Sequence, residues 1–336
     1  MLKPLIVITG PTAAGKTDFS IKLAREIGGE IISADSMQVY RGLDIGTDKV
    51  SKEVREEIPH YLIDVVEPYE KFSVADFVRL SDEAIREIQK KGKYPIVVGG
   101  TGFYIKSLLY GLPETPPSDE KIRRELQKLP TEELYKKLQK VDRKYAEKVG
   151  KNDRKRIVRA LEVYEITGKP LTSFKVWREK PRYPFLGFFL YRNRPELYRR
   201  IENRVDSQIE RGLVKETKKL LKYGKEITAF QALGYKEISD YLEGRKSLEE
   251  AVKTLKSRTK NFAKRQFTWF RKERGFDWVN LSEVSEEELL KRIKSNLKEL
   301  EGKLKRDNFK LNKTRGGGNE PSGYILKQTE EGENSC

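Results

Sequence analysis

The stretch Gly10-Pro11-Thr12-Ala13-Ala14-Gly15-Lys16-Thr17 decides the fold, and it follows a short apolar run, Leu5 to Ile8. It matches the phosphate-binding loop pattern, in which a glycine, four residues and Gly-Lys-Thr connect a strand to a helix. The glycines let backbone N–H groups converge on phosphate oxygens, the following helix offers its positive N-terminus, and Lys16 adds a point charge. Thr17 would hold a Mg²⁺ ion bound by the same phosphates. The loop predicts a di- or triphosphate ligand without specifying which.

Composition narrows the class of partner. The 336 residues contain 69 Lys and Arg against 52 Asp and Glu, a net charge of +17, which favours a polyanionic partner such as nucleic acid. A thermophile surface rich in Lys and Glu would explain the high total charge but not its positive imbalance. The single cysteine, Cys336, excludes an internal disulfide and a cysteine-based zinc site. No signal peptide or membrane span is recognisable, so we expect a cytoplasmic protein with no membrane partner. We also expect a monomer.

Short apolar segments then alternate with helical ones, which is typical of a parallel sheet covered on both faces. Helices fit between the first four strand candidates. We therefore expect an α/β fold with a sheet of the P-loop NTPase type. The strand candidates are Leu5–Ile8, Glu30–Ala34, Tyr61–Val65, Tyr94–Val98 and Phe185–Tyr191.

Proline clusters mark a change of character between Pro113 and Pro184, where the chain is charged and has a helical pattern without strands. We interpret residues 113–184 as an inserted all-helical domain, with residues 1–112 and 185–305 forming a discontinuous core. The part of the core from about 194 to 300 is expected to be helical and basic. Residues 306–336 are predicted to be a disordered or vector-derived tail.

Two polar segments follow strands at the expected ligand-binding edge of the sheet. Asp35 follows the second strand, where a carboxylate could hold Mg²⁺, accept a proton or cap the next helix. The fourth strand runs into Gly99 to Gly102, a second glycine-rich helix start whose Thr101 hydroxyl could stabilise a departing diphosphate. A simple strand-to-helix turn is the other interpretation of this segment.

Taken in order, these segments make the chain resemble the bacterial tRNA dimethylallyltransferases, also called tRNA isopentenyltransferases. The resemblance covers residues 5 to about 280. The matching segments, besides the phosphate loop, are Asp35–Tyr40, Gly42–Thr47, His60–Asp64, Val98–Gly102, Arg156–Val163, Leu233–Glu237 and Lys264–Arg271.

The resemblance implies transfer of a dimethylallyl group from dimethylallyl diphosphate to N6 of the adenine at tRNA position 37, just 3′ of the anticodon. Asp35 would then accept the N6 proton, Thr101 would hydrogen-bond the leaving oxygen, and Lys16 with Mg²⁺ on Thr17 would neutralise the diphosphate. The loop from Gly10 to Thr17 would hold that diphosphate, with Arg204 reaching it from a later helix beside Arg200. The adenine must leave its stack to reach such a pocket. Ser36 and Gln38 are candidates to read its edge.

Basic segments supply the expected contacts to the anticodon stem-loop of tRNA. Residues 257–274 combine seven cations with Phe262, Phe267, Trp269 and Phe270, a mixture that suits a phosphate backbone and an unstacked base. In the inserted domain, which would clamp the tRNA, Lys155 and Arg159 are four residues apart, although such a pair is usually a solvated face. The full set of predicted tRNA contacts is Asp35, Ser36, Met37, Gln38, Thr101, Arg123, Lys155, Arg156, Arg159, Gln231, Gly234, Tyr235, Lys236, Lys264, Arg265, Gln266, Trp269 and Arg271.

Two positions depart from the family pattern. Lys155 stands where relatives usually carry Gln, so a base contact there is reduced to a phosphate contact. Position 61 is Tyr where a second His is common, and His60 is the only histidine, so we interpret it as structural.

Three other functions use the same features. A small-molecule kinase shares the loop and the sheet, but the net charge and the basic aromatic segment argue against it. An adenylate isopentenyltransferase would perform the same chemistry on free AMP without needing the insertion. An NTP-regulated RNA-binding protein would not require Asp35 or Thr101.

Overall fold

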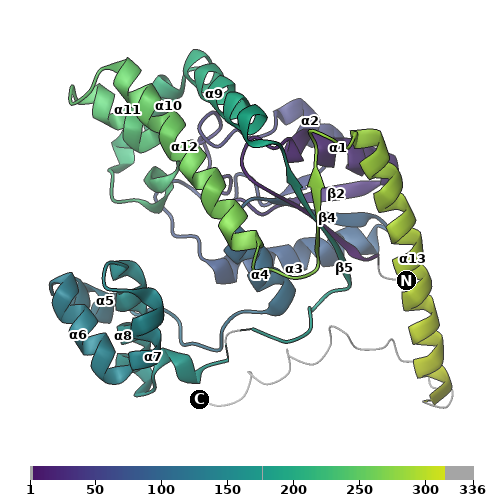
Figure 1. Cartoon of the computed structure of the whole chain (residues 1–336), viewed down its shortest axis with the longest axis horizontal. Coiled ribbons are helices and arrows are strands. Elements are labelled where there is room, and N and C mark those ends of the chain that lie inside the picture. The colour runs from purple at the N-terminus through teal and green to yellow at the C-terminus, as the bar shows by residue number, and fades with distance from the viewer. Residues whose placement is uncertain (1–2, 176, 315–336) are drawn as a thin grey trace. The chain divides into compact units, whose positions relative to one another are not determined.

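The computed structural model describes residues 3–175 and 177–314 and divides the chain into two compact units. Unit 1 comprises residues 1–109 with 182–336, and unit 2 comprises residues 110–181. These bounds lie close to the 113–184 expected for the insertion. Each unit has its own hydrophobic core, so the two are described separately (Figure 1).

Unit 1 is built on a six-stranded sheet in the order β3-β2-β4-β1-β5-β6, and every pairing in it is parallel. The central strand β1 is buried along its length, and Val7 lies opposite Val97 on one neighbour and Gly187 on the other. The fold-class prediction is confirmed. The strands are β1 (Leu5–Thr9), β2 (Gly29–Ser33), β3 (His60–Tyr61), β4 (Tyr94–Gly99), β5 (Phe185–Tyr191) and β6 (Phe276–Asn280).

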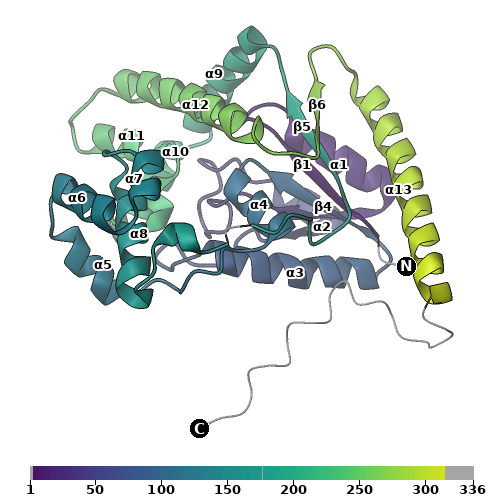
Figure 2. The same ribbon diagram turned by 60° about the horizontal axis from the view of Figure 1, so that its bottom comes forward.

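Helices cover both faces of this sheet, as the crossover directions require. The connection from β1 to β2 and the one from β3 to β4 run in opposite directions across the sheet, so right-handed crossovers place α1 (Lys16–Ile27) and α3 (Val74–Lys90) on opposite faces. Helix α13 (Glu286–Thr314) packs beside α1, where its Leu289 and Ile293 join Ile6 and Ile8 in one core cluster. Helix α4 (Gly102–Tyr110) lies near α3 (Figure 2).

A helical layer follows β5 and belongs to the same unit. Its core includes Val205, Leu213, Ala251 and Leu255, and Phe270 at the end of α12 packs on Phe189 of β5 with ring centroids 5.2 Å apart. This contact brings the basic helix α12 to the sheet. The elements of this layer are α9 (Arg194–Glu210), α10 (Leu213–Leu220), η2 (Leu221–Tyr223), η3 (Thr228–Gln231), α11 (Tyr235–Leu242) and α12 (Leu248–Phe270).

The secondary structure of unit 2, over its described residues, consists of helices without strands. Leu134 and Leu138 of one helix pack against Ile157 and Leu161 of another, and all four are essentially inaccessible to solvent. The elements are α5 (Glu120–Gln127), α6 (Thr131–Val141), α7 (Arg143–Val149), α8 (Arg154–Thr167) and η1 (Leu171–Ser173).

Three expected boundaries are corrected. The strand predicted at 61–65 pairs only at His60 and Tyr61, because Leu62 and Asp64 adopt left-handed backbone conformations with φ of 64° and 58°. The region from 194 to 300 contains the edge strand β6 as well as helices. Residues 306–314, which were predicted as part of the tail, belong to α13, which continues to Thr314. Residues 315–336 lie outside the described residues.

Short helices complete the core unit. Helix α2 (Lys52–Glu57) is capped at its N-terminus by Ser51, whose side chain accepts from the backbone N–H of Val54. In the part of the chain that the structure describes, no helix is both long enough and apolar enough to cross a membrane.

Candidate active site

The phosphate-binding loop joins β1 to α1 and depends on one glycine for its close approach to β5. Gly10 has φ of 145°, and a Cβ there would lie 2.0 Å from the carbonyl oxygen of Leu190. Ala13 and Gly15 also have positive φ, which turns the loop around its centre. Helix α1 then begins at Lys16, so its unpaired N–H groups face the same space.

Lys16 is partly buried in this loop. Its Nζ donates to the carbonyl oxygen of Pro11 at 2.8 Å. Burial and the nearby positive charge of Arg204 lower the pKa of Lys16 to about 7, against the opposing effect of Asp35. Because little negative charge offsets the charge of the Lys16 ammonium, this group is suited to bind an anionic ligand.

Three arginines donate hydrogen bonds to the phosphate-binding loop. Arg192 Nε donates to the carbonyl oxygen of Ala14 at 3.0 Å, and Arg200 Nε donates to that of Ala13 at 2.8 Å. Arg204 Nη1 donates to Thr12 Oγ1 at 3.1 Å and also pairs with Asp48 at 3.5 Å. The arginines therefore satisfy the carbonyl groups of Ala13 and Ala14 and the hydroxyl of Thr12. Arg192 was missed in the sequence, although its position directly after β5 was a usable signal.

Asp35 and Thr101 lie next to each other at the carboxyl ends of β2 and β4. Thr101 Oγ1 accepts from the backbone N–H of Ser36 at 3.2 Å, and Thr101 N–H donates to the carbonyl of Ala34 at 3.2 Å. Asp35 Oδ1 accepts from the backbone N–H groups of Met37 and Gln38 at 2.8 and 3.4 Å. The Thr101 oxygen thus accepts a hydrogen bond from Ser36, which leaves its O–H to act as a donor.

A cavity of about 310 Å³ opens between these two loops and helices α9 and α12. Twelve of the predicted site residues line it: Thr12, Lys16, Thr17, Asp35, Ser36, Met37, Gln38, Thr101, Arg204, Gln231, Arg265 and Gln266. The structure therefore brings together residues that are up to 254 positions apart. His60 also contributes to the wall, where its Nδ1 lies 2.6 Å from the carbonyl of Ile58, and burial lowers its pKa.

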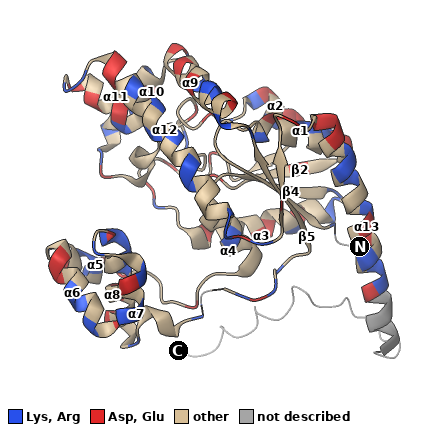
Figure 3. Ribbon diagram, in the orientation of Figure 1, with Lys and Arg blue, Asp and Glu red and all other residues tan. Residues whose placement is uncertain are grey.

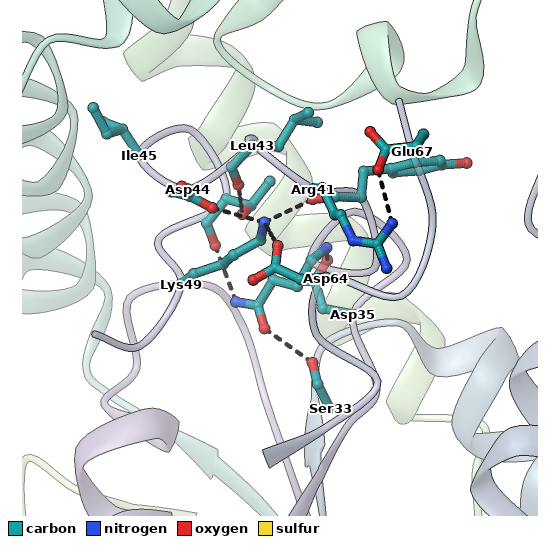
Figure 4. A network of polar contacts seen from close by, with 12 residues as sticks. Ser33, Asp35, Arg41, Leu43, Asp44, Ile45, Lys49, Asp64 and Glu67 are labelled. Carbon is teal, nitrogen blue, oxygen red and sulfur yellow. Dashed lines mark hydrogen bonds and ion pairs between the residues drawn. The ribbon is translucent and has the colours of Figure 1, made fainter. Parts of the chain in front are cut away.

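A polar network supports the loop that follows Asp35 (Figure 4). Lys49 is its centre, with a side chain only 1% exposed, and Nζ donates to the Tyr40 carbonyl at 2.6 Å, to Asp64 at 2.6 Å and to Asp44 at 2.8 Å. Arg55 completes the charge balance by pairing with Asp64 at 2.7 Å. This network holds the backbone around the cavity in one conformation.

Gln38 belongs to the same region and is tied down at both ends of its amide. Its Oε1 accepts from Ser33 Oγ at 2.9 Å, and its Nε2 donates to the Thr47 carbonyl at 3.1 Å. Each arm of the amide therefore has one protein partner and keeps one further N–H or lone pair toward the cavity, so the reading of a base edge by Gln38 stays a prediction. Ser36 remains a candidate for that contact.

Helix α12 supplies cations and an aromatic ring to the cavity wall. Arg258, Phe262 and Arg265 all line it, and the Arg265 guanidinium lies 5.6 Å from the centroid of the Phe262 ring. Arg258 also pairs with buried Glu237. Arg258 and Phe262 were counted in the basic aromatic segment but not among the predicted contacts. Their spacing of four residues places them on the same helix face, and this spacing could have identified them. Lys and Arg recur along this helix (Figure 3).

Several predicted tRNA contacts have other surroundings in the core unit. Tyr235 is completely buried, and its hydroxyl donates to Glu216 at 2.7 Å, so we correct its assignment to a structural one. Burial and Glu216 raise the pKa of this hydroxyl. Gly234 is buried and has φ of 103°, whereas Lys236 is exposed. Lys264 and Arg271 are exposed, and Trp269 is partly buried against Gly102.

The predicted contacts in unit 2 divide into two kinds. Arg123 and Arg159 both pair with the fully buried carboxylate of Glu162, at 2.8 and 2.6 Å. Lys155 and Arg156 are exposed at the start of α8. The first two are therefore held by a buried carboxylate. The second two are exposed, and Arg156 pairs with Asp153 at 3.3 Å.

The donor atoms present fit a magnesium ion that is bound mainly through phosphate. Among residues 3–175 and 177–314, no group of three or more His, Cys, Asp or Glu side chains could hold a metal alone. Mg²⁺ commonly keeps its waters and takes one or two protein oxygens in addition to substrate phosphates. Thr17 lines the cavity beside Lys16 and offers such an oxygen.

Comparison with family models identifies relatives of the chain. The IPP transferase model matches residues 38–273, and the isopentenyl transferase model matches residues 3–66. The chain is 51% identical to a tRNA dimethylallyltransferase of Sulfurihydrogenibium sp. over 290 residues, which are 85% of this chain and 94% of that protein. The tRNA dimethylallyltransferase of Carboxydothermus hydrogenoformans is 48% identical over 303 residues, 87% and 97% of the two chains.

Solved structures agree with these sequence matches. The full-length tRNA isopentenylpyrophosphate transferase of Bacillus halodurans is 40% identical with a TM-score of 0.68, and the match covers 90% of this chain and 99% of that one. A eukaryotic dimethylallyltransferase acting on tRNA is 33% identical with a TM-score of 0.73, over 84% and 75% of the two chains.

Proposed function

Because this chain belongs to the IPP transferase family of tRNA dimethylallyltransferases, it is a prenyl-transferring enzyme acting on tRNA, and we propose how its cavity performs the transfer. The donor is dimethylallyl diphosphate, and the acceptor is N6 of the adenine at tRNA position 37. The observation that carries the proposal is the hydrogen bond from Ser36 N–H to Thr101 Oγ1, which ties the Thr101 hydroxyl to the loop that carries Asp35, in the cavity that also contains Lys16.

The diphosphate of the donor binds in the loop from Gly10 to Thr17. Its negative charge meets the Lys16 ammonium, which in the described structure has a backbone carbonyl as its hydrogen-bond acceptor. The N-terminus of α1 adds the partial positive charge of the helix. Thr17 would hold a Mg²⁺ ion, which supplies charge neutralisation of the diphosphate when it is bound.

Asp35 and Thr101 act on the two ends of the reacting system. The lone pair of N6 forms a bond to C1 of the dimethylallyl group while the bond from C1 to the diphosphate oxygen breaks. Asp35 accepts the proton that N6 loses, and the Thr101 hydroxyl donates to the departing oxygen. The exocyclic amine is a poor nucleophile, so positioned groups at both ends lower the barrier.

The acceptor side of the cavity suits a nucleobase taken out of its stack. Phe262 offers a ring face, Arg258 and Arg265 offer cations, and Ser36 and Gln231 offer hydrogen bonds. An unpaired loop base costs least to unstack, which favours the anticodon loop. All these residues come from one chain, so we propose that the enzyme acts as a monomer. We also propose that it acts in the cytoplasm.

Exposed cations outside the cavity contact the anticodon stem-loop. Lys236, Lys264 and Arg271 do so from the core unit, and Lys155 and Arg156 do so from unit 2, which clamps the RNA. Arg123 and Arg159, held by Glu162, give that unit a fixed positive surface.

The test offers labelled dimethylallyl diphosphate and Mg²⁺ to unmodified tRNA with adenines 3′ of the anticodon, in parallel with AMP and with ATP. We expect label in tRNA only, at position 37 after nuclease mapping. Label in AMP would instead assign the cavity to a free nucleotide. ATP turnover without prenyl transfer would identify a kinase or an RNA-stimulated NTPase.

A further inference from the structure

Gln266 occupies an unusual place on the basic helix α12. Its neighbours Lys264 and Arg265 are exposed, but Gln266 itself is only 6% exposed. A buried amide needs partners for both its oxygen and its nitrogen. This burial separates Gln266 from the cations with which the sequence groups it.

The amide has one partner on each of the two loops of the site. Oε1 accepts from the backbone N–H of Thr12 at 2.9 Å, and Nε2 donates to the carbonyl oxygen of Gly100 at 3.1 Å. The reversed amide would place donor against donor and acceptor against acceptor, so only one orientation satisfies both loops. Gln266 therefore spans the gap between the phosphate loop and the Thr101 loop.

Position 100 is shaped to receive this amide. A Cβ at Gly100 would lie 2.1 Å from Gln266 Nε2, which is shorter than any normal contact. With glycine at 100 the Gln266 amide lies close to the backbone, and a side chain at 100 would have to shift this amide from its place. A larger residue at 100 would displace the amide without altering Gln266 itself.

Both loops reach the reacting atoms. Thr12 lies four residues before Lys16 and is also held by Arg204, and Gly100 directly precedes Thr101. In the proposed function Lys16 binds the phosphates and Thr101 donates to the leaving oxygen. The distance between these two residues therefore determines whether both can contact the diphosphate at once. A change of about 1 Å in such geometry is enough to cost about 100-fold in rate.

We propose that Gln266 is a positioning residue that sets the spacing between the phosphate loop and the Thr101 loop, and that it is not a tRNA contact. The inference rests on the proposed function of this cavity. It assigns to Gln266 an effect on the rate of transfer and none on the affinity for tRNA.

The first test compares Gln266→Met, which keeps the size and removes both hydrogen bonds, with Thr268→Ala on the exposed side of the same helix. We expect kcat of Gln266→Met to fall about 10- to 100-fold. The tRNA Kd by filter binding should stay within about twofold, and circular dichroism and thermal melting check that the variant folds. Thr268→Ala should match the wild type in every measurement.

A second variant gives a readout that simple loosening of the fold would not produce. In Gln266→Glu the ionised carboxylate still accepts from Thr12 but repels the Gly100 carbonyl, whereas the protonated acid donates to that carbonyl. The kcat of Gln266→Glu relative to wild type should therefore rise as pH falls from 8 to 6. Gly100→Ala should reproduce the loss of kcat, and adding Gln266→Met to it should cause little further loss.

Three outcomes would overturn the inference. Gln266→Met could behave like Thr268→Ala, or it could weaken tRNA binding at unchanged kcat, which would make Gln266 an RNA contact. Fully additive losses in the Gly100→Ala and Gln266→Met pair would also contradict it. Absence of transfer by the wild-type enzyme is a different result, since it removes the proposed function together with this inference.

Discussion

Thr101 Oγ1 accepts a hydrogen bond from the backbone N–H of Ser36 at 3.2 Å, which fixes the hydroxyl beside the residue that follows Asp35. The bond connects the end of β2 with the start of α4. It places a hydroxyl donor and a carboxylate acceptor at the same edge of the sheet. The proposed reaction needs both groups, since the adenine N6 loses a proton and the dimethylallyl carbon loses its diphosphate.

Replacing Asp35 by Asn tests the base. The amide keeps an oxygen for the Met37 N–H but cannot take a proton from N6, so kcat should fall by about 10²- to 10⁴-fold. The tRNA Kd should be nearly unchanged, because one carboxylate contributes little to binding a polyanion. Single-turnover assays and filter binding measure the two quantities. Turnover at the wild-type rate would remove Asp35 as the base.

Thr101 can be tested by a graded series. Thr101→Ser keeps the hydroxyl and should retain activity within about tenfold of wild type. Thr101→Val has a similar shape without a donor to the leaving oxygen, and a loss of about 10²- to 10³-fold is expected for one such donor. Equal kcat values for the Ser and Val variants would show that the hydroxyl does not act on the leaving group.

Glu216 should control the stability of the loop at 44–46. Its buried carboxylate accepts from the backbone N–H groups of Asp44, Ile45 and Gly46, each at 2.9 Å, and from the Tyr235 hydroxyl. Glu216→Gln turns an amide NH₂ toward these donors and should lower the free energy of unfolding by about 1–3 kcal/mol.

The control for that change is Glu210→Gln, an exposed carboxylate on α9. Urea denaturation at pH 7 measures the free energy of unfolding of the wild type, the Glu216→Gln variant and the Glu210→Gln control. Tyr235→Phe removes a single donor and should cost less than Glu216→Gln. A Glu216→Gln protein as stable as the Glu210→Gln control would contradict the anchoring role.

His60 should lose a small part of the stability in weakly acidic solution. Burial lowers its pKa below the usual 6.5, and the unfolded chain therefore binds the proton more readily than the folded one. The stability contributed by the neutral ring is complete above pH 6.5 and is lost as pH falls through the folded pKa. Since His60 is the only histidine, its ring NMR signals titrate without ambiguity.

His60→Asn is the matched variant for this effect. It should flatten the pH dependence of the urea midpoint below pH 6.5, while the Glu210→Gln control keeps the slope. An NMR pKa at or above 6.5 would be incompatible with the burial of the ring. The expected role is structural, as the absence of a second histidine already indicates.

The sequence predicted the parts of the fold that depend on local pattern. The seven residues Phe185–Tyr191 form a continuous apolar run, and β5 has those bounds. Asp35 and Thr101 could be placed because each directly follows a buried strand. The edge strand β6 was not predicted, because only its last two residues are buried and its sequence lacks the continuous apolar run of the inner strands.

Other features of the site depend on contacts distant in sequence. The Gln266 bridge joins residues 254 positions apart, and no spacing rule predicts it. The family resemblance indicated Tyr235 as a tRNA contact, but Tyr235 is buried and its hydroxyl donates to Glu216. Burial in the final packing, rather than residue type, decided which polar side chains remain free for substrate.

The exposed end of α12 should carry part of the salt dependence of tRNA binding. Lys264→Ala and Arg271→Ala each remove an exposed cation, so each should weaken binding and reduce the slope of log K against log salt by about 1. Lys298→Ala removes an exposed cation from α13, which lies at a distance from α12 (Figure 1), and should leave the slope unchanged. Filter binding between 50 and 200 mM salt, about the range over which phosphate contacts weaken, measures the three slopes. If Lys298→Ala lowers the slope as much as Lys264→Ala, the effect follows net charge and α12 is not the RNA-binding surface.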